Sequence, residues 1–238
     1  MKKLALFVEG KTEQIFALRL LTELAGRHKL AFAVQLGSGG ASGCRRWEEV
    51  RFFSPEGAEF FVLIYNSATD SRVLSDLGDQ YRSLKKAGYD RVLGLTDLFP
   101  GARSTLASKQ RMMDEHLRRT GVTARMILAV MEIEAWFLAE ERHYSQLDTR
   151  LTAEVVAAVL GGPPETLCIE DIAHPSDALD RVYAQAGLRY LKAQKKTEPK
   201  IERTVAALDI ENLVLHVAAR VPALGELCQE LDQFLTLS

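Results

Sequence analysis

Short apolar segments that alternate with amphipathic segments restrict the fold of this sequence more than any other feature. Residues Leu4–Val8 are all apolar. Similar, mostly apolar segments recur at residues 30–36, 60–65, 91–96 and 125–131. Segments with a helical period of apolar residues lie between them, at residues 12–25, 73–86 and 106–119. A strand that is apolar along its whole length is typical of parallel sheets covered on both faces. The pattern therefore predicts an α/β fold with a mainly parallel sheet flanked by helices.

The last hundred residues carry a different pattern, because strand-like segments stop after about Glu141. Helical periodicity predominates there, at residues 153–160, 176–186, 201–208, 210–219 and 223–235. The clearest break is Gly161-Gly162-Pro163-Pro164. We therefore expect an α/β domain over residues 1–140 and a helical C-terminal subdomain over residues 141–238.

Composition excludes several classes of protein. The 238 residues include 30 Lys and Arg against 32 Asp and Glu, a net charge of −2. Such a balance gives no overall attraction to nucleic acid, so any binding must come from local basic groups. The three cysteines lie far apart without a CxxC pair, which favours a cytoplasmic location over a disulfide framework. Without an apolar stretch of roughly 18–20 residues, we expect no membrane partner. Neither HExxH nor GxSxG occurs, so zinc hydrolases and α/β-hydrolases are not favoured.

Acidic residues follow three of the predicted strands. They are Glu9 after the first strand, Asp97 after residues 91–96, and Glu132 with Glu134 after residues 125–131. The carboxyl ends of parallel strands meet at one edge of a sheet, where ligand sites form. Taken singly, each acid is better explained as a complement to a helix N-terminus. Together they predict an oxygen-rich site for a hard divalent cation such as Mg²⁺.

The segment Phe7-Val8-Glu9-Gly10-Lys11-Thr12-Glu13 resembles the opening motif of TOPRIM domains, which occur in topoisomerases, DnaG-type primases and OLD-family nucleases. The resemblance implies that Glu9 lies beside the metal and acts as an acid or base, and that Gly10 makes a tight turn. TOPRIM domains also carry an Asp-x-Asp motif after a later strand. Asp97 matches its first aspartate, whereas Phe99 occupies the position of the second.

Two further segments extend the resemblance. Residues 129–138, Ala-Val-Met-Glu-Ile-Glu-Ala-Trp-Phe-Leu, resemble the E-x-E-A-W-x-L segment of a TOPRIM-like family of uncharacterised bacterial proteins. Tyr190 and Lys192 resemble a Tyr-x-Lys element of the same family. Its members are often paired with ABC-type ATPases in phage-defence gene pairs. The resemblance therefore implies an ATPase partner and a role in anti-phage defence.

Three of the acidic positions leave alternatives open. Glu13 lies in the first turn of a predicted helix, where it either shares the metal site or only complements the helix dipole. Glu132 and Glu134 share one face if their segment is still a strand. If a helix has begun there, the two side chains diverge and only one can serve as a ligand.

Basic residues that could meet a phosphodiester are scattered along the chain. We expect Lys192 to neutralise charge on the transition-state phosphate, and Lys11 could do so from closer to Glu9. Nucleic-acid contacts are expected at Arg45, Arg46, Arg103 and Lys109. Residues 37–43 are rich in glycine but lack a P-loop pattern, so a flexible loop is favoured over a phosphate cradle.

These observations predict a nuclease dependent on Mg²⁺ or Mn²⁺ that hydrolyses DNA or RNA. The expected catalytic residues are Glu9, Asp97 and Lys192, and the expected metal ligands are Glu9, Asp97, Glu132 and Glu134. Two alternatives stay open. One is a non-catalytic TOPRIM scaffold that binds or regulates within an ATPase complex, which Phe99 and the near-neutral charge favour. The other is nucleotidyl transfer, as in primases. Fold alone does not choose among these.

Overall fold

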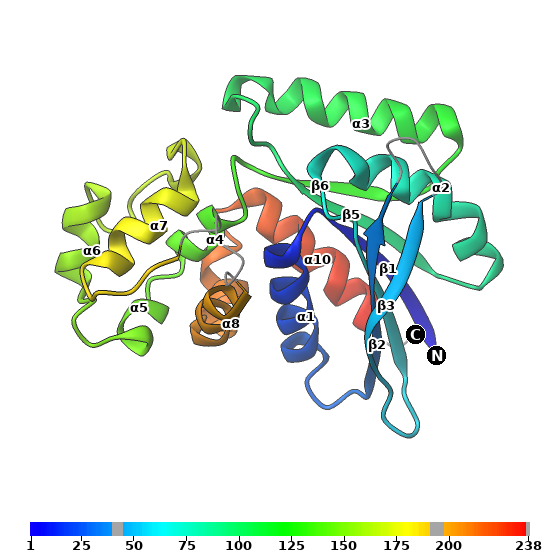
Figure 1. Cartoon of the computed structure of the whole chain (residues 1–238), viewed down its shortest axis with the longest axis horizontal. Coiled ribbons are helices and arrows are strands. Elements are labelled where there is room, and N and C mark those ends of the chain that lie inside the picture. Colours follow the sequence, from blue (N-terminus) through cyan, green and yellow to red (C-terminus); the bar gives the residue numbers. More distant parts are fainter. Residues whose placement is uncertain (40–44, 191–197, 237–238) are drawn as a thin grey trace. The chain divides into compact units, whose positions relative to one another are not determined.

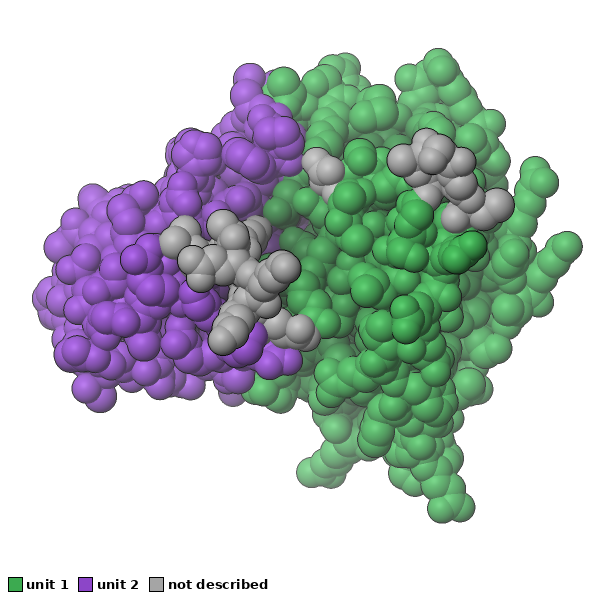
Figure 2. Space-filling view, in the orientation of Figure 1, with its two compact units in different colours: residues 1–97, 105–128, 229–238 green, residues 98–104, 129–228 purple. Residues whose placement is uncertain are grey.

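The structure is a computed structural model that describes residues 1–39, 45–190 and 198–236 (Figure 1). The chain forms two compact units. Unit 1 consists of residues 1–97, 105–128 and 229–238, and unit 2 of residues 98–104 and 129–228 (Figure 2). These boundaries differ from a division at residue 140. A compact unit need not fold by itself, so the predicted domain boundary stays a prediction.

The described residues contain one sheet of six strands in the order β3-β2-β4-β1-β5-β6. The strands are β1 (Lys2–Val8), β2 (Leu30–Ser38), β3 (Arg46–Phe53), β4 (Phe60–Asn66), β5 (Arg91–Asp97) and β6 (Arg125–Ala129). β1 lies parallel to both β4 and β5, and β2 lies parallel to β4. Only the pairing of β2 with β3 is antiparallel among the strand pairs with a described register. The predicted α/β fold with a mainly parallel sheet is confirmed.

Helices cover both faces of the sheet, as its apolar central strands require. All five residues of Leu4–Val8 in β1 are completely buried. Three helices connect the strands of unit 1: α1 (Lys11–Ala25), α2 (Val73–Lys86) and α3 (Leu106–Thr120). α1 lies on one side of the sheet, and α2 and α3 lie together on the other (Figure 1). The connection from β1 through α1 runs one way along the sheet, whereas those from β4 through α2 and from β5 through α3 run the other way. Right-handed crossovers in opposite directions place their helices on opposite faces.

The C-terminal part is helical, as predicted. The α-helices after β6 are α4 (Glu134–Ala139), α5 (His143–Leu147), α6 (Ala153–Leu160), α7 (Pro175–Ala184), α8 (Glu198–Ala207), α9 (Ile210–Asn212) and α10 (Pro222–Leu235). Shorter elements are the 3₁₀ turns η1 (Asp70–Arg72), η2 (Arg103–Thr105) and η3 (Ile169–Asp171), and the π-helix η4 (Leu213–Val217). Within the described ranges, every helix is too short or too polar to span a bilayer.

Three local expectations need correction. The sequence pattern missed β3, because this edge strand is exposed or half-buried throughout and carries charges on both faces. Gly37 and Ser38 continue β2 and do not belong to a loop, while residues 40–43 of the predicted loop lie outside the described residues. The predicted strand over residues 125–131 ends at Ala129. Met131 there has a positive φ of 61°, which is incompatible with a continuing strand.

Candidate functional site at the carboxyl edge of the sheet

The strand order creates a switch point between β1 and β5. The connection from β1 leads through α1 to β2, whereas that from β5 leads through α3 to β6 on the opposite side. In open α/β sheets, ligands bind in the crevice that forms where neighbouring connections diverge in this way. Glu9 is the first residue after β1, and Asp97 is the last residue of β5. The two predicted acids therefore stand at the position that the topology favours for a ligand.

A pair of hydrogen bonds joins the ends of these two strands. One carboxylate oxygen of Glu9, Oε2, accepts from the hydroxyl of Thr96 at 2.9 Å and from the backbone N–H of Asp97 at 3.0 Å. Thr96 and Asp97 are buried, and Glu9 is half-buried. Hydrogen bonds to a carboxylate favour its charged form. Nothing in the local sequence pattern marks Thr96 as a partner of Glu9, so its role was not predictable from the sequence.

Lys109 brings a positive charge to the same place. It lies in the first turn of α3, and its Nζ donates to the backbone carbonyl oxygen of Asp97 at 2.7 Å. The sequence suggested Lys109 as a nucleic-acid contact. The structure places it beside the Glu9–Asp97 pair, while its contact with nucleic acid stays a prediction.

Gly10 and Glu13 form the start of α1. The backbone N–H of Gly10 donates to Oε2 of Glu13 at 2.9 Å, which satisfies a donor that precedes the helix. The contact gives the buried Glu13 a capping role at the start of α1, and its choice between metal ligand and helix-dipole complement stays open. Gly10 has φ −153°, extended backbone that any residue adopts, so backbone freedom is not what requires glycine here. Lys11, half-buried, is the first residue of α1.

Glu132 and Glu134 diverge, because the strand has ended and α4 begins at Glu134. The alternative in which they share one strand face is wrong. Glu132 Oε2 accepts from the backbone N–H of Ser176 at 2.8 Å. Glu134 Oε1 accepts from the hydroxyl of Tyr190 at 2.7 Å. All four residues belong to unit 2, and both carboxylates are buried.

The carboxylate residues near the strand ends can be compared with the oxygen ligands that a hard cation such as Mg²⁺ requires. Glu9 and Asp97 are two carboxylate residues at neighbouring strand ends of unit 1, and two carboxylates are a number that suits Mg²⁺, which keeps several water ligands. In the part of the chain that the structure describes, no three His, Cys, Asp or Glu side chains are grouped closely enough to hold a metal ion. The four-carboxylate site therefore stays a prediction.

The predicted basic contacts have different surroundings. Arg45 is 13% exposed and pairs with the completely buried Asp76 at 2.8 Å, which gives it a structural role. Arg103 pairs with Asp171 and, at 3.7 Å, with Glu170, all within unit 2. Arg46 is exposed at the start of β3. Lys192 lies outside the described residues.

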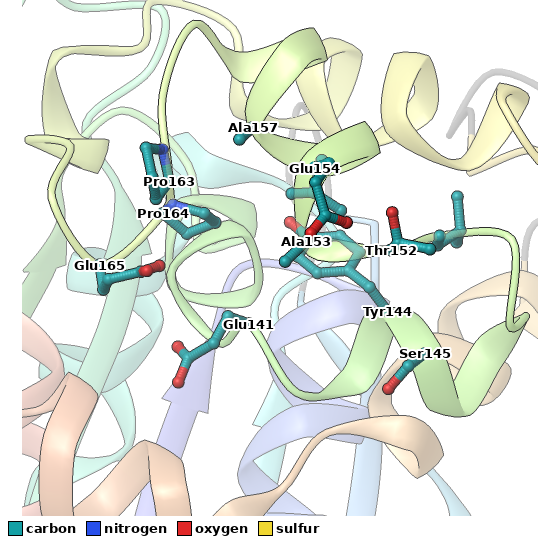
Figure 3. Close-up of a pocket in the computed structure, with 12 residues that line it drawn as sticks. Glu141, Tyr144, Ser145, Thr152, Ala153, Glu154, Ala157, Pro163, Pro164 and Glu165 are labelled. Atoms are coloured by element: carbon teal, nitrogen blue, oxygen red, sulfur yellow. The ribbon is translucent and has the colours of Figure 1, made fainter.

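Unit 2 contains a cavity of about 400 Å³ that the sequence did not predict (Figure 3). Tyr144, Pro163 and Pro164 supply apolar wall, and the carboxylates of Glu141, Glu154 and Glu165 lie around it. A hydrogen bond from the Thr152 hydroxyl lowers the pKa of Glu154, which favours its charged form. An acidic border of this kind repels a polyanion. The cavity is therefore unsuited to nucleic acid.

Comparisons with known proteins leave the family open. No family model and no curated protein sequence matches the chain. Among solved structures, it is similar to a cell surface hydrolase from Lactobacillus plantarum WCFS1, with 11% sequence identity and a TM-score of 0.30. The match covers 68% of this chain and 64% of that one. A likeness this distant bears on neither the fold nor the activity.

Proposed function

We propose that the chain is a Mg²⁺-dependent nuclease in which Glu9 and Asp97 are the metal ligands of unit 1. The observation that carries the proposal is the hydrogen-bonded link between these residues at the switch point of the sheet. The hydroxyl of Thr96 and the N–H of Asp97 orient one oxygen of Glu9 and favour its charged form. An oriented carboxylate is what a hard cation requires of its ligands.

Glu9 and Lys109 then have distinct roles in phosphodiester hydrolysis. When bound, Mg²⁺ would polarise the scissile phosphate and acidify water. Glu9, half-buried at the strand end, would accept the proton of the attacking water. Lys109, with its ammonium 2.7 Å from the Asp97 carbonyl oxygen, would offset charge that develops on the phosphate.

The wider parts of the proposal rest on the resemblance to the TOPRIM-like family. They are the roles of Glu132, Glu134 and Lys192, the ABC-type ATPase partner, and the place in anti-phage defence. A cytoplasmic location also stays a prediction.

Calorimetric titration with Mn²⁺ and Mg²⁺ tests the proposal directly. We expect binding to the wild-type protein and its loss in both Glu9→Gln and Asp97→Asn. Glu56→Gln is a matched control, because Glu56 is exposed before β4, at the opposite edge of the sheet. Unchanged binding in the two site variants would rule out these residues as ligands. Cleavage assays on single- and double-stranded DNA and RNA would follow with the same variants.

A non-catalytic scaffold is the second candidate, and Phe99 favours it. This residue stands where TOPRIM domains carry a second aspartate. Its ring packs edge-on against the His174 ring, with 5.7 Å between the ring centres. Its backbone N–H donates to the Met131 carbonyl oxygen at 2.8 Å. The scaffold predicts no metal binding through Glu9 and Asp97. Primase-like transfer, by contrast, predicts products that grow only when nucleoside triphosphates are added.

A further inference from the structure

A second cavity, of about 370 Å³, lies in unit 1 near the carboxyl ends of β2 and β4. Arg45, Ser67 and Arg72 are among its lining residues, with the exposed Thr69 and Ser71 at its border. Its polar lining residues are thus arginines and hydroxyl-bearing residues, the groups that bind anions. Sequence reasoning missed Arg72 and Ser67, because neither belongs to a recognisable phosphate-binding pattern.

The two guanidinium groups at this cavity differ in how tightly they are held. Arg45 donates to the Ser67 carbonyl at 2.6 Å and to Asp76 at 2.8 Å, and its guanidinium lies 4.9 Å from the centre of the Trp47 ring. Arg72 is 31% exposed, and its Nε lies 3.8 Å from Asp76. Asp76 is therefore paired mainly with Arg45. The guanidinium of Arg72 is the more accessible of the two to a ligand.

The polar groups that a ligand can reach at this cavity are donors. The side chain of Arg72 is partly exposed, and Thr69 and Ser71 are exposed. The hydroxyl of Ser67 and Oδ1 of Asp76 lie below the surface without a hydrogen-bond partner in the described part of the chain. A guanidinium beside hydroxyl groups suits an anion with several acceptor oxygens.

One lining residue of the cavity is bonded to the end of β1, the strand that Glu9 follows. The backbone N–H of Ser67 donates to the carbonyl of Val8 at 2.9 Å, and the next residue along the chain is Glu9. β4, β1 and β5 are successive neighbours in the sheet. Adjacent strands lie about 5 Å apart, so the ends of β4 and β5 are separated by about 10 Å. A short nucleic-acid segment spans such a distance.

We propose that this cavity binds a phosphate group of the nucleic-acid backbone and thereby positions a neighbouring phosphodiester at Glu9 and Asp97. This assignment rests on the proposed nuclease function. Arg72 supplies the charge and the exposed Thr69 a hydroxyl donor, and phosphate oxygens accept from both. Arg72 is a positioning residue, because it acts on a phosphate other than the one that is cleaved.

Phosphate binding in the absence of metal tests the assignment. Inorganic phosphate is titrated into the metal-free protein at constant ionic strength, followed by a short oligonucleotide. Loss of one charge-assisted hydrogen bond weakens binding by about tenfold or more, which is the effect we expect for Arg72→Gln on both probes. Thr69→Ala should weaken binding less. Arg27→Gln is the control, since Arg27 is exposed before β2, at the opposite edge.

The outcomes separate this inference from the nuclease proposal. In an active wild-type enzyme, Arg72→Gln should raise KM for an oligonucleotide with little change in kcat. An Arg72→Gln protein that folds and binds phosphate and oligonucleotide like the wild type would overturn the inference. So would a wild-type protein that binds neither probe. A wild-type protein that binds phosphate but no metal ion would instead overturn the nuclease proposal alone.

Discussion

The carboxylate of Glu9 accepts a hydrogen bond from the backbone N–H of Asp97 at 3.0 Å, although the two lie 88 positions apart in sequence. The contact exists because β1 and β5 are parallel neighbours, with Val8 opposite Leu95. Glu9 follows Val8, and Thr96 and Asp97 follow Leu95, so these residues lie together at the strand ends. The position of one acid therefore depends directly on the backbone of the other.

Thr96→Val should weaken the candidate metal site without touching a proposed ligand. The substitution removes the hydroxyl that donates to Glu9 at 2.9 Å, a hydrogen bond to a charged group. We expect a loss of about 1–2 kcal/mol in the free energy of unfolding, measured with urea, and weaker Mn²⁺ binding by calorimetry. Thr22→Val is the control, because its hydroxyl donates within α1, to the Leu18 carbonyl oxygen. Unaltered Mn²⁺ affinity in Thr96→Val would contradict the orienting role.

Gly10→Ala tests whether this turn requires glycine. The φ of −153° suits alanine, and the added Cβ would lie 3.3 Å from Oε2 of Glu13, a contact that a small shift relieves. We expect the free energy of unfolding to fall by no more than about 1 kcal/mol. Gly26→Ala should cost more, because Gly26 has φ +56°, where a Cβ is strained. A Gly10 variant that is the more damaged of the two would refute this comparison.

Arg45→Met should destabilise the fold rather than selectively weaken nucleic-acid binding. It leaves the buried Asp76 without its partner at 2.8 Å, and breaking a buried pair costs about 3–5 kcal/mol. The double variant Arg45→Met/Asp76→Leu should recover much of the loss, since no uncompensated charge remains. Thermal and urea unfolding of the three proteins give the comparison. If Arg45→Met is as stable as the wild type, the pair of Arg45 with Asp76 contributes little to the free energy of unfolding.

Glu140 should make stability depend on pH. Burial by itself raises the pKa of this carboxyl, but hydrogen bonds from His143, Asn212 and Arg142 outweigh it and lower the pKa. The stabilisation is therefore present above the ordinary carboxyl pKa and is lost as pH falls through the lowered pKa of the folded state. Urea unfolding of wild type and Glu140→Gln should differ most near neutral pH and converge in acid. A difference that is constant with pH would contradict the assignment.

The two described cysteines should react at very different rates. Burial raises the pKa of Cys228 to about 11, whereas Cys168 is exposed. In a Cys44→Ser background, a thiol reagent at neutral pH should modify Cys168 rapidly and Cys228 only after unfolding, because the thiolate is the reactive form. Mass spectrometry of peptides from the labelled protein identifies the site. Rapid labelling of Cys228 in the folded protein would contradict its burial.

Local pattern was sufficient for most of the elements and for two of the site residues. The apolar run Leu4–Val8 indicates a strand buried on both faces whatever its neighbours are, and the acid that follows it must then emerge at the sheet edge. Asp97 follows by the same reasoning. The edge strand β3 escaped prediction because an exposed strand has no apolar period to detect.

The partners of those acids required the tertiary structure. Hydrogen bonds such as those of Thr96 with Glu9 and of Tyr190 with Glu134 join residues 87 and 56 positions apart. The divergence of Glu132 from Glu134 likewise depends on where β6 ends, at a residue whose neighbours are equally apolar. Apolar burial is recorded locally in the sequence, because each side chain carries its own hydrophobicity. Hydrogen-bond partners are set by strand order and register, which only the folded chain determines.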